Sequence, residues 1–322
     1  MRLWLKSLRK LSIFLFLYGC VERFYVGEEG GVTPGKGGGT WVLTTLSPEL
    51  WYIDDSARRV IFADLWANSI LKVGDTIFIA NSGTNTVFKY IIPNSEIETL
   101  RVGDGRNPYS LAYSHLNNTL FVSNFLTSTI SAFKGKNLIS EFETCGNPEG
   151  LYVAGRKLFV SCTNYYFDMR GELWIHDVFT FDTIKTFRTG INAQSVILDG
   201  DGDIYVLSTG DYSGRETYLY RITENIDSFF IGGYLGKMCI SKSGYLFLVG
   251  WYGGVYRFDW AEERGDGFII SDISASSCSV KGDTLIISDF DNDRILYTDF
   301  SGRRIKIFYV GDGPIDVYAE EF

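Results

Sequence analysis

Short apolar strands separated by polar turns recur along this chain of 322 residues at intervals of about forty residues. Each copy contains an apolar strand that ends in a small or polar residue, as in residues 76–81, 119–124 and 284–289. Strands that repeat with this period cannot bury an apolar face alone and stack around a common axis. The pattern therefore predicts an all-β fold, a β-propeller.

The innermost strand of each predicted blade sets the count of blades. We expect these strands to begin at Ser69, Ser110, Gly150, Ser195, Met238, Ser277 and Asp316. Seven inner strands predict a seven-bladed β-propeller with four antiparallel strands per blade.

The two ends of the repeat region are each incomplete. Residues 41–45, 50–54 and 58–63 form three expected strands without an inner strand, whereas residues 315–319 form an expected inner strand with nothing after it. We expect the C-terminal strand to pair beside residues 41–45 and to complete one blade with the three N-terminal strands. This closure would remove two exposed sheet edges.

One copy has a recognisable core sequence. Residues 79–87 read Ile-Ala-Asn-Ser-Gly-Thr-Asn-Thr-Val, and residues 122–124 and 160–164 follow the same pattern. These copies resemble the bacterial surface-propeller repeat named YVTN for its Tyr-Val-Thr-Asn core, and the resemblance spans residues 41–319. It implies a propeller but no particular activity, because this fold serves binding proteins, lyases, lactonases and electron-transfer enzymes.

The first twenty residues are unlike the repeats. Four basic residues precede an apolar segment, residues 11–18, that is shorter than the roughly twenty residues needed to span a bilayer. The pattern is typical of an export signal. The segment ends in Leu17-Tyr18-Gly19-Cys20, which resembles a bacterial lipobox, although Tyr18 stands where a small residue is usual. An ordinary cleaved signal with an unrelated cysteine is the alternative.

The lipobox resemblance implies that Cys20 becomes the lipidated N-terminus and holds the protein on a membrane. Val21 follows it in place of the Asp that would retain the protein at an inner membrane, so the resemblance implies an outer-membrane location. We therefore divide the chain into a lipoprotein signal peptide (1–20), a glycine-rich tether (21–39) and a β-propeller (40–322).

The charge of the chain excludes one class of partner. Its formal net charge is −9, and about −13 without the basic residues of the signal segment. No basic cluster follows that segment, which argues against nucleic-acid binding. We expect a monomeric domain without a cofactor.

Four cysteines lie within the repeats, and their spacing fits no zinc or haem motif. Cys239 and Cys278 occupy equivalent positions on neighbouring inner strands, where we expect two buried thiols that act as small apolar residues. A disulfide between them is the alternative in an oxidising compartment. Pairing of Cys145 with Cys162 is left open.

The residues beside the start of each inner strand should surround the mouth of the central channel. These candidate ligand-binding residues are Asn68, Tyr109, Glu149, Gln194, Lys237 and Ser276, with Ile315 as the seventh. Glu149 and Lys237 could form an ion pair or contact a polar ligand. A solvated polar plug is the alternative.

Long loops of three consecutive blades should share that face and carry aromatic side chains. They contain Tyr165, Tyr166, Tyr212, Trp251 and Tyr252. Exposed aromatic clusters anchor proteins, peptides or sugars. The alternative is that these rings cover the edges of the blades.

Evidence for an enzyme is sparse. The two histidines, His115 and His176, fall in an expected hairpin turn and an expected third strand, away from the mouth. The acidic runs 199–203 and 289–293 align with a hairpin turn and a repeat loop, so we assign no metal site and no catalytic residue.

We therefore expect a membrane-anchored, non-catalytic binding or scaffold protein of the bacterial cell envelope, with an envelope protein or glycan as its partner. The alternative is a metal-dependent lactonase or lyase-like enzyme at the channel mouth. Asn68, Glu149 and Gln194 would supply part of its ligand set, whereas Lys237 would repel the metal.

Overall fold

The computed structural model describes residues 38–64 and 66–320. The expected signal peptide, Cys20 and nearly all of the expected tether lie outside the described residues. Within them, no helix is long and apolar enough to cross a membrane.

The described chain consists of β-strands with two short 3₁₀ turns, η1 (Ile92–Asn94) and η2 (Phe290–Asn292). The strands of the N-terminal half are β1 (Thr40–Thr44), β2 (Glu49–Ile53), β3 (Ala57–Phe62), β4 (Ala67–Val73), β5 (Thr76–Asn81), β6 (Thr86–Ile91), β7 (Glu96–Arg101), β8 (Pro108–Ser114), β9 (Thr119–Asn124), β10 (Thr129–Lys134), β11 (Asn137–Glu143), β12 (Pro148–Ala154), β13 (Lys157–Cys162) and β14 (Arg170–Asp177). Those of the C-terminal half are β15 (Thr183–Ile191), β16 (Ala193–Leu198), β17 (Ile204–Ser208), β18 (Tyr218–Ile222), β19 (Ile226–Phe230), β20 (Lys237–Ile240), β21 (Tyr245–Gly250), β22 (Gly254–Asp259), β23 (Arg264–Ile270), β24 (Ala275–Lys281), β25 (Thr284–Asp289), β26 (Arg294–Thr298), β27 (Arg304–Tyr309) and β28 (Pro314–Ala319).

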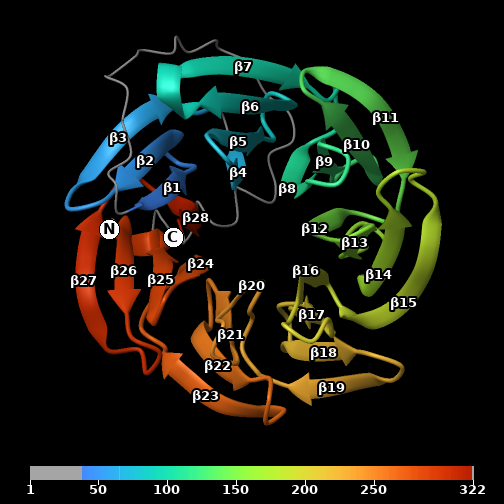
Figure 1. The fold of residues 1–322 in the computed structure, drawn as a ribbon. Coiled ribbons are helices and arrows are strands. Elements are labelled where there is room, and N and C mark those ends of the chain that lie inside the picture. Colours follow the sequence, from blue (N-terminus) through green and yellow to red (C-terminus); the bar gives the residue numbers. More distant parts are fainter. Residues whose placement is uncertain (1–37, 65, 321–322) are drawn as a thin grey trace.

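These strands form seven four-stranded antiparallel sheets arranged around one axis, which confirms the predicted propeller (Figure 1). Blade 1 has the order β28-β1-β2-β3, and blades 2 to 7 use consecutive strands from β4 to β27. Because successive strands alternate in direction, the loops between blades and the loops between second and third strands share one face. We call it the loop face.

The expected starts of the inner strands match those of β4, β8, β12, β16, β20, β24 and β28 to within two residues. The prediction for blade 6 was wrong in its register. Lys237 pairs with Val249, the position at which Ser69 pairs with Ala80 in blade 2, so this inner strand begins one residue earlier than Met238 suggested. β20 is short and is preceded by Gly236, so the residue types at its start do not mark its register.

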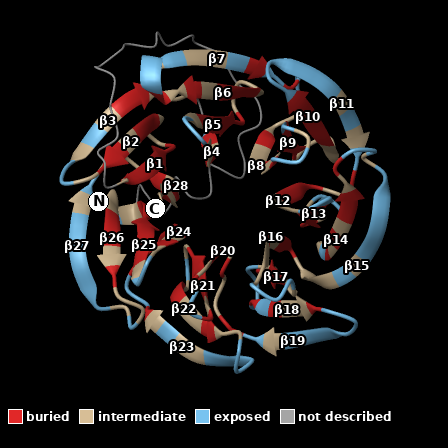
Figure 2. Ribbon diagram, viewed as in Figure 1, coloured by how far each residue is buried: buried red, intermediate tan, exposed pale blue. Residues whose placement is uncertain are grey.

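Seven apolar clusters hold the ring together, one between each pair of adjacent blades. The cluster between blades 7 and 1, for example, combines Ile286 and Ile295 with Val42, Ile53 and Val317. Burial decreases outward within a blade, and the outermost strands carry most of the exposed positions (Figure 2). The core is thus a ring of interfaces between sheets, as expected for face-packed blades.

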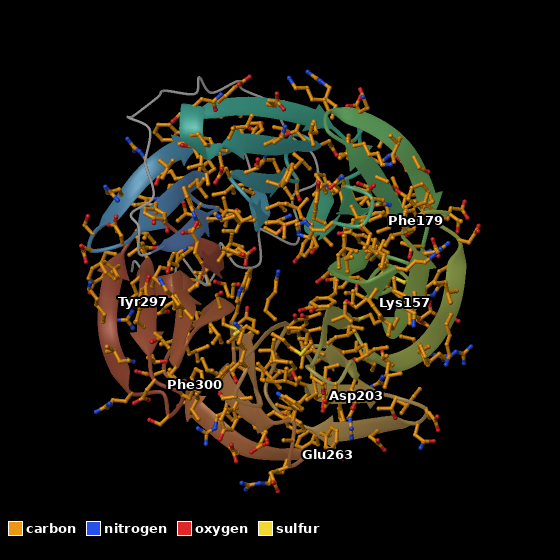
Figure 3. The ribbon with its side chains drawn as sticks, viewed as in Figure 1. Lys157, Phe179, Asp203, Glu263, Tyr297 and Phe300 are labelled. Atoms are coloured by element: carbon orange, nitrogen blue, oxygen red, sulfur yellow. A yellow bond between two sulfur atoms is a disulfide. The ribbon has the colours of Figure 1, made fainter. Side chains whose placement is uncertain are left out.

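Polar contacts reinforce some of these interfaces at the outer edge. Arg221 in blade 5 binds Asp203 in its own blade through Nε and Nη2 (2.9 and 2.6 Å) and also pairs with Glu263 in blade 6. Figure 3 shows Asp203 and Glu263 on these neighbouring blades.

The four cysteines of the repeats form two disulfides. The expectation of buried thiols at Cys239 and Cys278 was therefore wrong. Cys145 bonds to Cys162, and Cys239 bonds to Cys278, each with Cα atoms 5.8 Å apart. The second bond joins inner strands β20 and β24 of adjacent blades. With the corrected register of β20, Cys239 lies one position farther along its strand than Cys278 does along β24, because Cys239 pairs with Phe247 and Cys278 with Ile287.

The chain ends meet in blade 1, as predicted. β28 pairs antiparallel with β1, from Thr40 opposite Ala319 to Thr44 opposite Pro314. Beyond the strand, the Glu320 carboxylate accepts hydrogen bonds from the Gly39 amide (3.0 Å) and the Trp41 indole (3.1 Å), and it pairs with Lys72 of blade 2 (3.1 Å). Burial raises the pKa of Glu320, but these three partners outweigh it and leave the pKa lowered.

Removal of residues 313–322 should abolish cooperative folding. The truncation takes β28 and Glu320 out of blade 1 and uncovers the apolar clusters on both of its sides. Thermal and urea unfolding of residues 38–312 should show no sigmoidal transition, whereas residues 38–322 should unfold cooperatively. Equal transitions in the two proteins would contradict this closure.

Candidate functional site

A β-bulge places the candidate residues of the inner ring. In six inner strands the register slips by a residue near the loop face, so that an extra residue is left unpaired. The bulged residues are Asn68, Tyr109 with Ser110, Glu149, Gln194, Ser276 and Ile315. Because a bulge re-aims a side chain and is frequent next to functional sites, these residues form a ring of special positions. We call it the inner ring.

Blade 6 departs from this pattern. β20 pairs without a bulge, and Gly236 stands at the ring position that the sequence assigned to Lys237. A Cβ on Gly236 would lie only 2.1 Å from Oε1 of Gln194, so a side chain there would displace Gln194. Lys237 is therefore one residue farther along its strand than Glu149 is along β12.

Three ring side chains are engaged in contacts that join the blades or hold the loops. Asn68 donates to Ser82 Oγ, and Ser276 donates to the carbonyl of Pro314 in blade 1 (2.6 Å). Gln194 donates to the Tyr212 hydroxyl (3.2 Å). Each of these three side chains therefore has a hydrogen-bond partner within the protein.

Glu149 differs from its neighbours in the ring. The residue is only 6% exposed, and neither its carboxyl nor the Lys237 ammonium forms a hydrogen bond or an ion pair with the described residues. Burial raises the pKa of Glu149 to about 8, and the nearby Lys237 ammonium limits the rise. A buried carboxyl without a partner is costly to a fold and is a common mark of a functional site.

The backbone around Glu149 is held from several sides. The disulfide from Cys145 ends at Cys162, which pairs directly with Pro148. Asn147 donates to the carbonyl of Phe125 (2.9 Å) and accepts the amide of Tyr166 (3.1 Å). Glu149 therefore extends from a rigid turn rather than from a mobile loop.

A second carboxylate near the ring, which the sequence did not single out, is fully partnered. Asp316 accepts from Ser277 Oγ (2.6 Å) and from the amides of Ile70 (2.9 Å) and Val317 (3.1 Å). It joins blades 7, 1 and 2, so its role is structural. The contrast isolates Glu149 as the carboxyl available to a ligand.

Two tyrosines complete the electrostatic surroundings of Glu149. Burial, then Glu149, raises the pKa of Tyr109 and of Tyr212, with Asp316 contributing at Tyr109. Tyr109 comes from the bulge in β8, and Tyr212 comes from the β17–β18 loop. Blades 3, 4, 5 and 6 therefore converge on the Glu149 carboxyl.

Aromatic side chains continue outward from the ring on the loop face. Tyr109 contacts Phe125 (5.8 Å between centroids), Phe125 contacts Tyr166 (5.9 Å), and Tyr166 contacts Tyr165 (5.4 Å). We call these rings and the group below the aromatic rim.

The second part of the rim lies over blades 5 and 6. Tyr212 contacts Tyr234 (5.3 Å) and Tyr252 (6.4 Å), while Trp251 stacks on Phe290 (5.1 Å). The sequence did not single out four aromatic residues of the loop face, Phe125, Phe167, Tyr234 and Phe290. Phe125 and Phe290 directly follow the polar residues that end β9 and β25, in short loops rather than in the long loops that were expected to carry the aromatic side chains.

The other candidates have structural roles. His176 is buried, with Nε2 3.0 Å from Thr144 Oγ1, and burial lowers its pKa. Asp199 accepts the amides of its own hairpin turn, and Asp289 binds Arg294 (2.7 Å). Among the described residues, no group of three or more His, Cys, Asp or Glu side chains is arranged to hold a metal ion.

Comparisons with known proteins give the fold alone. The chain matches no protein-family model and no curated protein sequence. It is similar to a catalytically inactive variant of virginiamycin B lyase from Staphylococcus aureus with quinupristin, at 12% identity and a TM-score of 0.63 over 79% of this chain and 92% of that one.

Two further structures share the fold. The Pan2 WD40 domain of Neurospora crassa has 10% identity and a TM-score of 0.62 over 78% of this chain and 81% of that one. A chain of a nidogen/laminin complex has 11% identity and a TM-score of 0.57, over 87% and 97%. Lyases and binding domains both occur among these structures, so the likeness assigns no activity.

Replacement of Glu149 by Gln should alter how stability depends on pH. The folded-state pKa of Glu149, about 8, lies above the ordinary value of 4.5, so the folded state binds the extra proton between these values. Wild-type stability should be fullest below pH 4.5 and fall as pH rises toward 8, by up to about 1.4 kcal/mol per pH unit. In Glu149→Gln this contribution is absent.

The measurement is urea unfolding of both proteins at pH 5, 6.5 and 8. The stability of Glu149→Gln relative to wild type should increase with pH. Parallel stability curves would show that the carboxyl titrates normally in the folded protein.

Proposed function

We propose that this protein is a non-catalytic binding module of the bacterial cell envelope, and that its loop face holds a polypeptide partner. The observation that carries the proposal is the aromatic rim, which presents rings from blades 3 to 7 on the loop face, two of which, Tyr109 and Tyr212, interact with the buried Glu149. Partly exposed aromatic side chains on a rigid scaffold supply apolar contact area at a low cost in conformational entropy.

The exposure of the rim supports a binding role. Tyr252 is 57% exposed and Tyr166 52%. Phe167, which we add to the rim because it lies in the same β13–β14 loop as Tyr166, is 73% exposed. The backbone beneath is fixed by neighbouring inner strands and by two disulfides. Such a surface resembles the aromatic anchors that dominate protein interfaces.

A polypeptide suits this rim better than a glycan. Tyr166 meets Tyr165 and Phe125 edge-on, at 84° and 68°, and Tyr212 meets Tyr252 at 72°. Rings in edge-to-face clusters present ridges and notches rather than flat platforms for stacking on sugars. The highly exposed Phe167 also has no polar group with which to bind sugar hydroxyls.

The proposed location rests on the lipobox resemblance around Cys20 and on the resemblance of the repeats to the YVTN-type surface propellers. The two disulfides fit an exported protein, because structural disulfides persist in oxidising compartments. We propose lipid attachment at Cys20 to the outer membrane, with residues 21–39 as the tether.

Loss of the exposed rim should abolish partner capture. We predict that a triple Tyr166→Ala, Phe167→Ala, Tyr252→Ala variant captures none of the protein that cross-links to wild type in solubilised envelopes, with an affinity loss of at least tenfold. The control is Phe230→Ala with Tyr309→Ala, which removes similarly exposed rings (61% and 69%) from outer strands β19 and β27.

Mass spectrometry of cross-linked peptides and glycan-array binding identify what is captured. A polypeptide lost only in the rim variant supports the proposal. Equal capture by both variants, or binding to a glycan alone, would contradict it.

Replacement of Cys20 by Ser should release the protein from membranes. In a bacterial host fed an alkyne fatty acid, wild type should be labelled and should sediment with membranes, whereas Cys20→Ser should be neither. The matched control is Tyr18→Ala, which places a small residue in the lipobox and should preserve labelling. Labelled Cys20→Ser would refute the anchor.

The lactonase or lyase-like alternative requires a divalent ion at Asn68, Glu149 and Gln194. Two of these side chains are engaged elsewhere, Asn68 with Ser82 and Gln194 with Tyr212, and the Lys237 ammonium lies near the third. Measurement of bound calcium before and after chelation tests this alternative, and stoichiometric calcium would favour the enzyme.

A further inference from the structure

An acidic residue of the inner ring, Glu149, and a basic residue next to the ring, Lys237, lie near each other without forming a pair. Glu149 comes from β12 of blade 4 and Lys237 from β20 of blade 6, with β16 of blade 5 between them. Lys237 acts on Glu149 through space, yet no hydrogen bond or ion pair joins the two side chains. Near these groups, Asp316 accepts hydrogen bonds from Ser277 and Ile70, and Gln194 donates one to Tyr212.

This arrangement selects among ligands by charge. A cation bound to Glu149 would be repelled by Lys237, and an anion bound to Lys237 would leave Glu149 buried without a partner. A ligand that carries both charges satisfies both groups at once. Burial favours such pairing, because a partly desolvated, charge-assisted hydrogen bond is stronger than one in water.

We propose that the inner ring binds an amphoteric group, with its ammonium on Glu149 and its carboxylate on Lys237. The inference rests on the proposed function, because it names the chemical group that the loop face recognises at its centre. Two sources carry this chemistry: a free amino acid, and the terminal residue of a polypeptide, such as a C-terminal lysine.

The frame around the two groups favours one fixed position for the ligand. The bulge and the disulfide at Cys162 hold Glu149, while the close approach of Gly236 to Gln194 fixes the backbone before Lys237. The groups that face Glu149 from other elements are Lys237 (β20), Tyr109 (β8) and Tyr212 (β17–β18 loop). The two tyrosine rings supply apolar walls for the methylene groups of a ligand.

Binding should also release a proton. With a pKa of about 8, the carboxyl of the empty site is mostly protonated at pH 7. An ammonium group favours the carboxylate form, so occupation of the site transfers the Glu149 proton to the buffer. Nearly one proton should leave per ligand at pH 7, and almost none at pH 9.5.

The test is isothermal titration of the folded propeller with glycine, 4-aminobutanoate and 6-aminohexanoate. Alkylamines and alkanoates of the same lengths are the single-charge controls. At least one amino acid should bind at least tenfold more tightly than both of its controls. The best length reports the spacing between the Glu149 carboxyl and the Lys237 ammonium.

Two near-isosteric variants assign the contacts. Glu149→Gln should remove the gain from the ammonium and the release of a proton, whereas Lys237→Met should remove the gain from the carboxylate and keep the proton release. Far-ultraviolet circular dichroism and thermal unfolding check that both variants fold. If either variant fails to fold, the wild-type protein still provides a test. Its binding enthalpy in two buffers of different ionisation enthalpy reports whether a proton is released when the ligand binds.

A second pair of probes separates the two sources. Acetyl-Gly-Gly-Lys with a free C-terminus should bind more tightly than 6-aminohexanoate if the source is a polypeptide end, and its C-terminal amide should bind at least tenfold more weakly. A peptide weaker than the free amino acid assigns the site to amino acids.

The inference is overturned if no amino acid exceeds its single-charge controls, or if the preference survives in both variants. Capture of a partner that still depends on Tyr166, Phe167 and Tyr252 would then leave the proposed function standing. Conversely, amino-acid binding with capture unaffected by the rim variant would remove the proposed function and leave the inner-ring site.

Discussion

Pairing of β28 with β1 is the constraint on which the rest of the structure depends. Each blade buries its two faces against two neighbours, so a linear row of sheets would leave an apolar face bare at each end. Because the last strand of the chain completes the first blade, the seventh interface closes and every sheet has two partners. Glu320 continues the closure to Lys72 in blade 2.

Closure brings the starts of seven inner strands together, and the bulges near those starts determine what the ring offers. Several polar side chains near the ring form hydrogen bonds within the protein, as Ser276 does with Pro314 and Asp316 does with Ser277. These contacts hold the blades in register. Glu149 is buried by the same geometry but has no hydrogen-bond partner. At this point the ring therefore offers a ligand an unpaired carboxyl group.

The sequence predicted the fold well because the repeat is a local pattern read seven times. Strand alternation, hairpin turns and the incomplete ends sufficed to place β28 beside β1. It failed where one blade departs from the others: β20 is short and preceded by Gly236, so its register was set one residue late.

The site was harder to predict because it depends on contacts between blades. Glu149 and Gln194 look equivalent in sequence, yet only Gln194 reaches a partner, Tyr212. The disulfides likewise depend on distances that spacing along the chain does not give. Phe125 and Phe290 joined the rim from short loops that carry no compositional signal.

The central claim is that the closed ring of blades buries one carboxyl, that of Glu149, which is protonated when the site is empty. Infrared difference spectroscopy during a pH titration, with Glu149→Gln as the reference, observes the carbonyl stretch of that protonated carboxyl directly. The account predicts that the band persists through neutral pH and disappears near pH 8. A band that is lost between pH 4 and 5, in the range usual for an exposed glutamate, would contradict it.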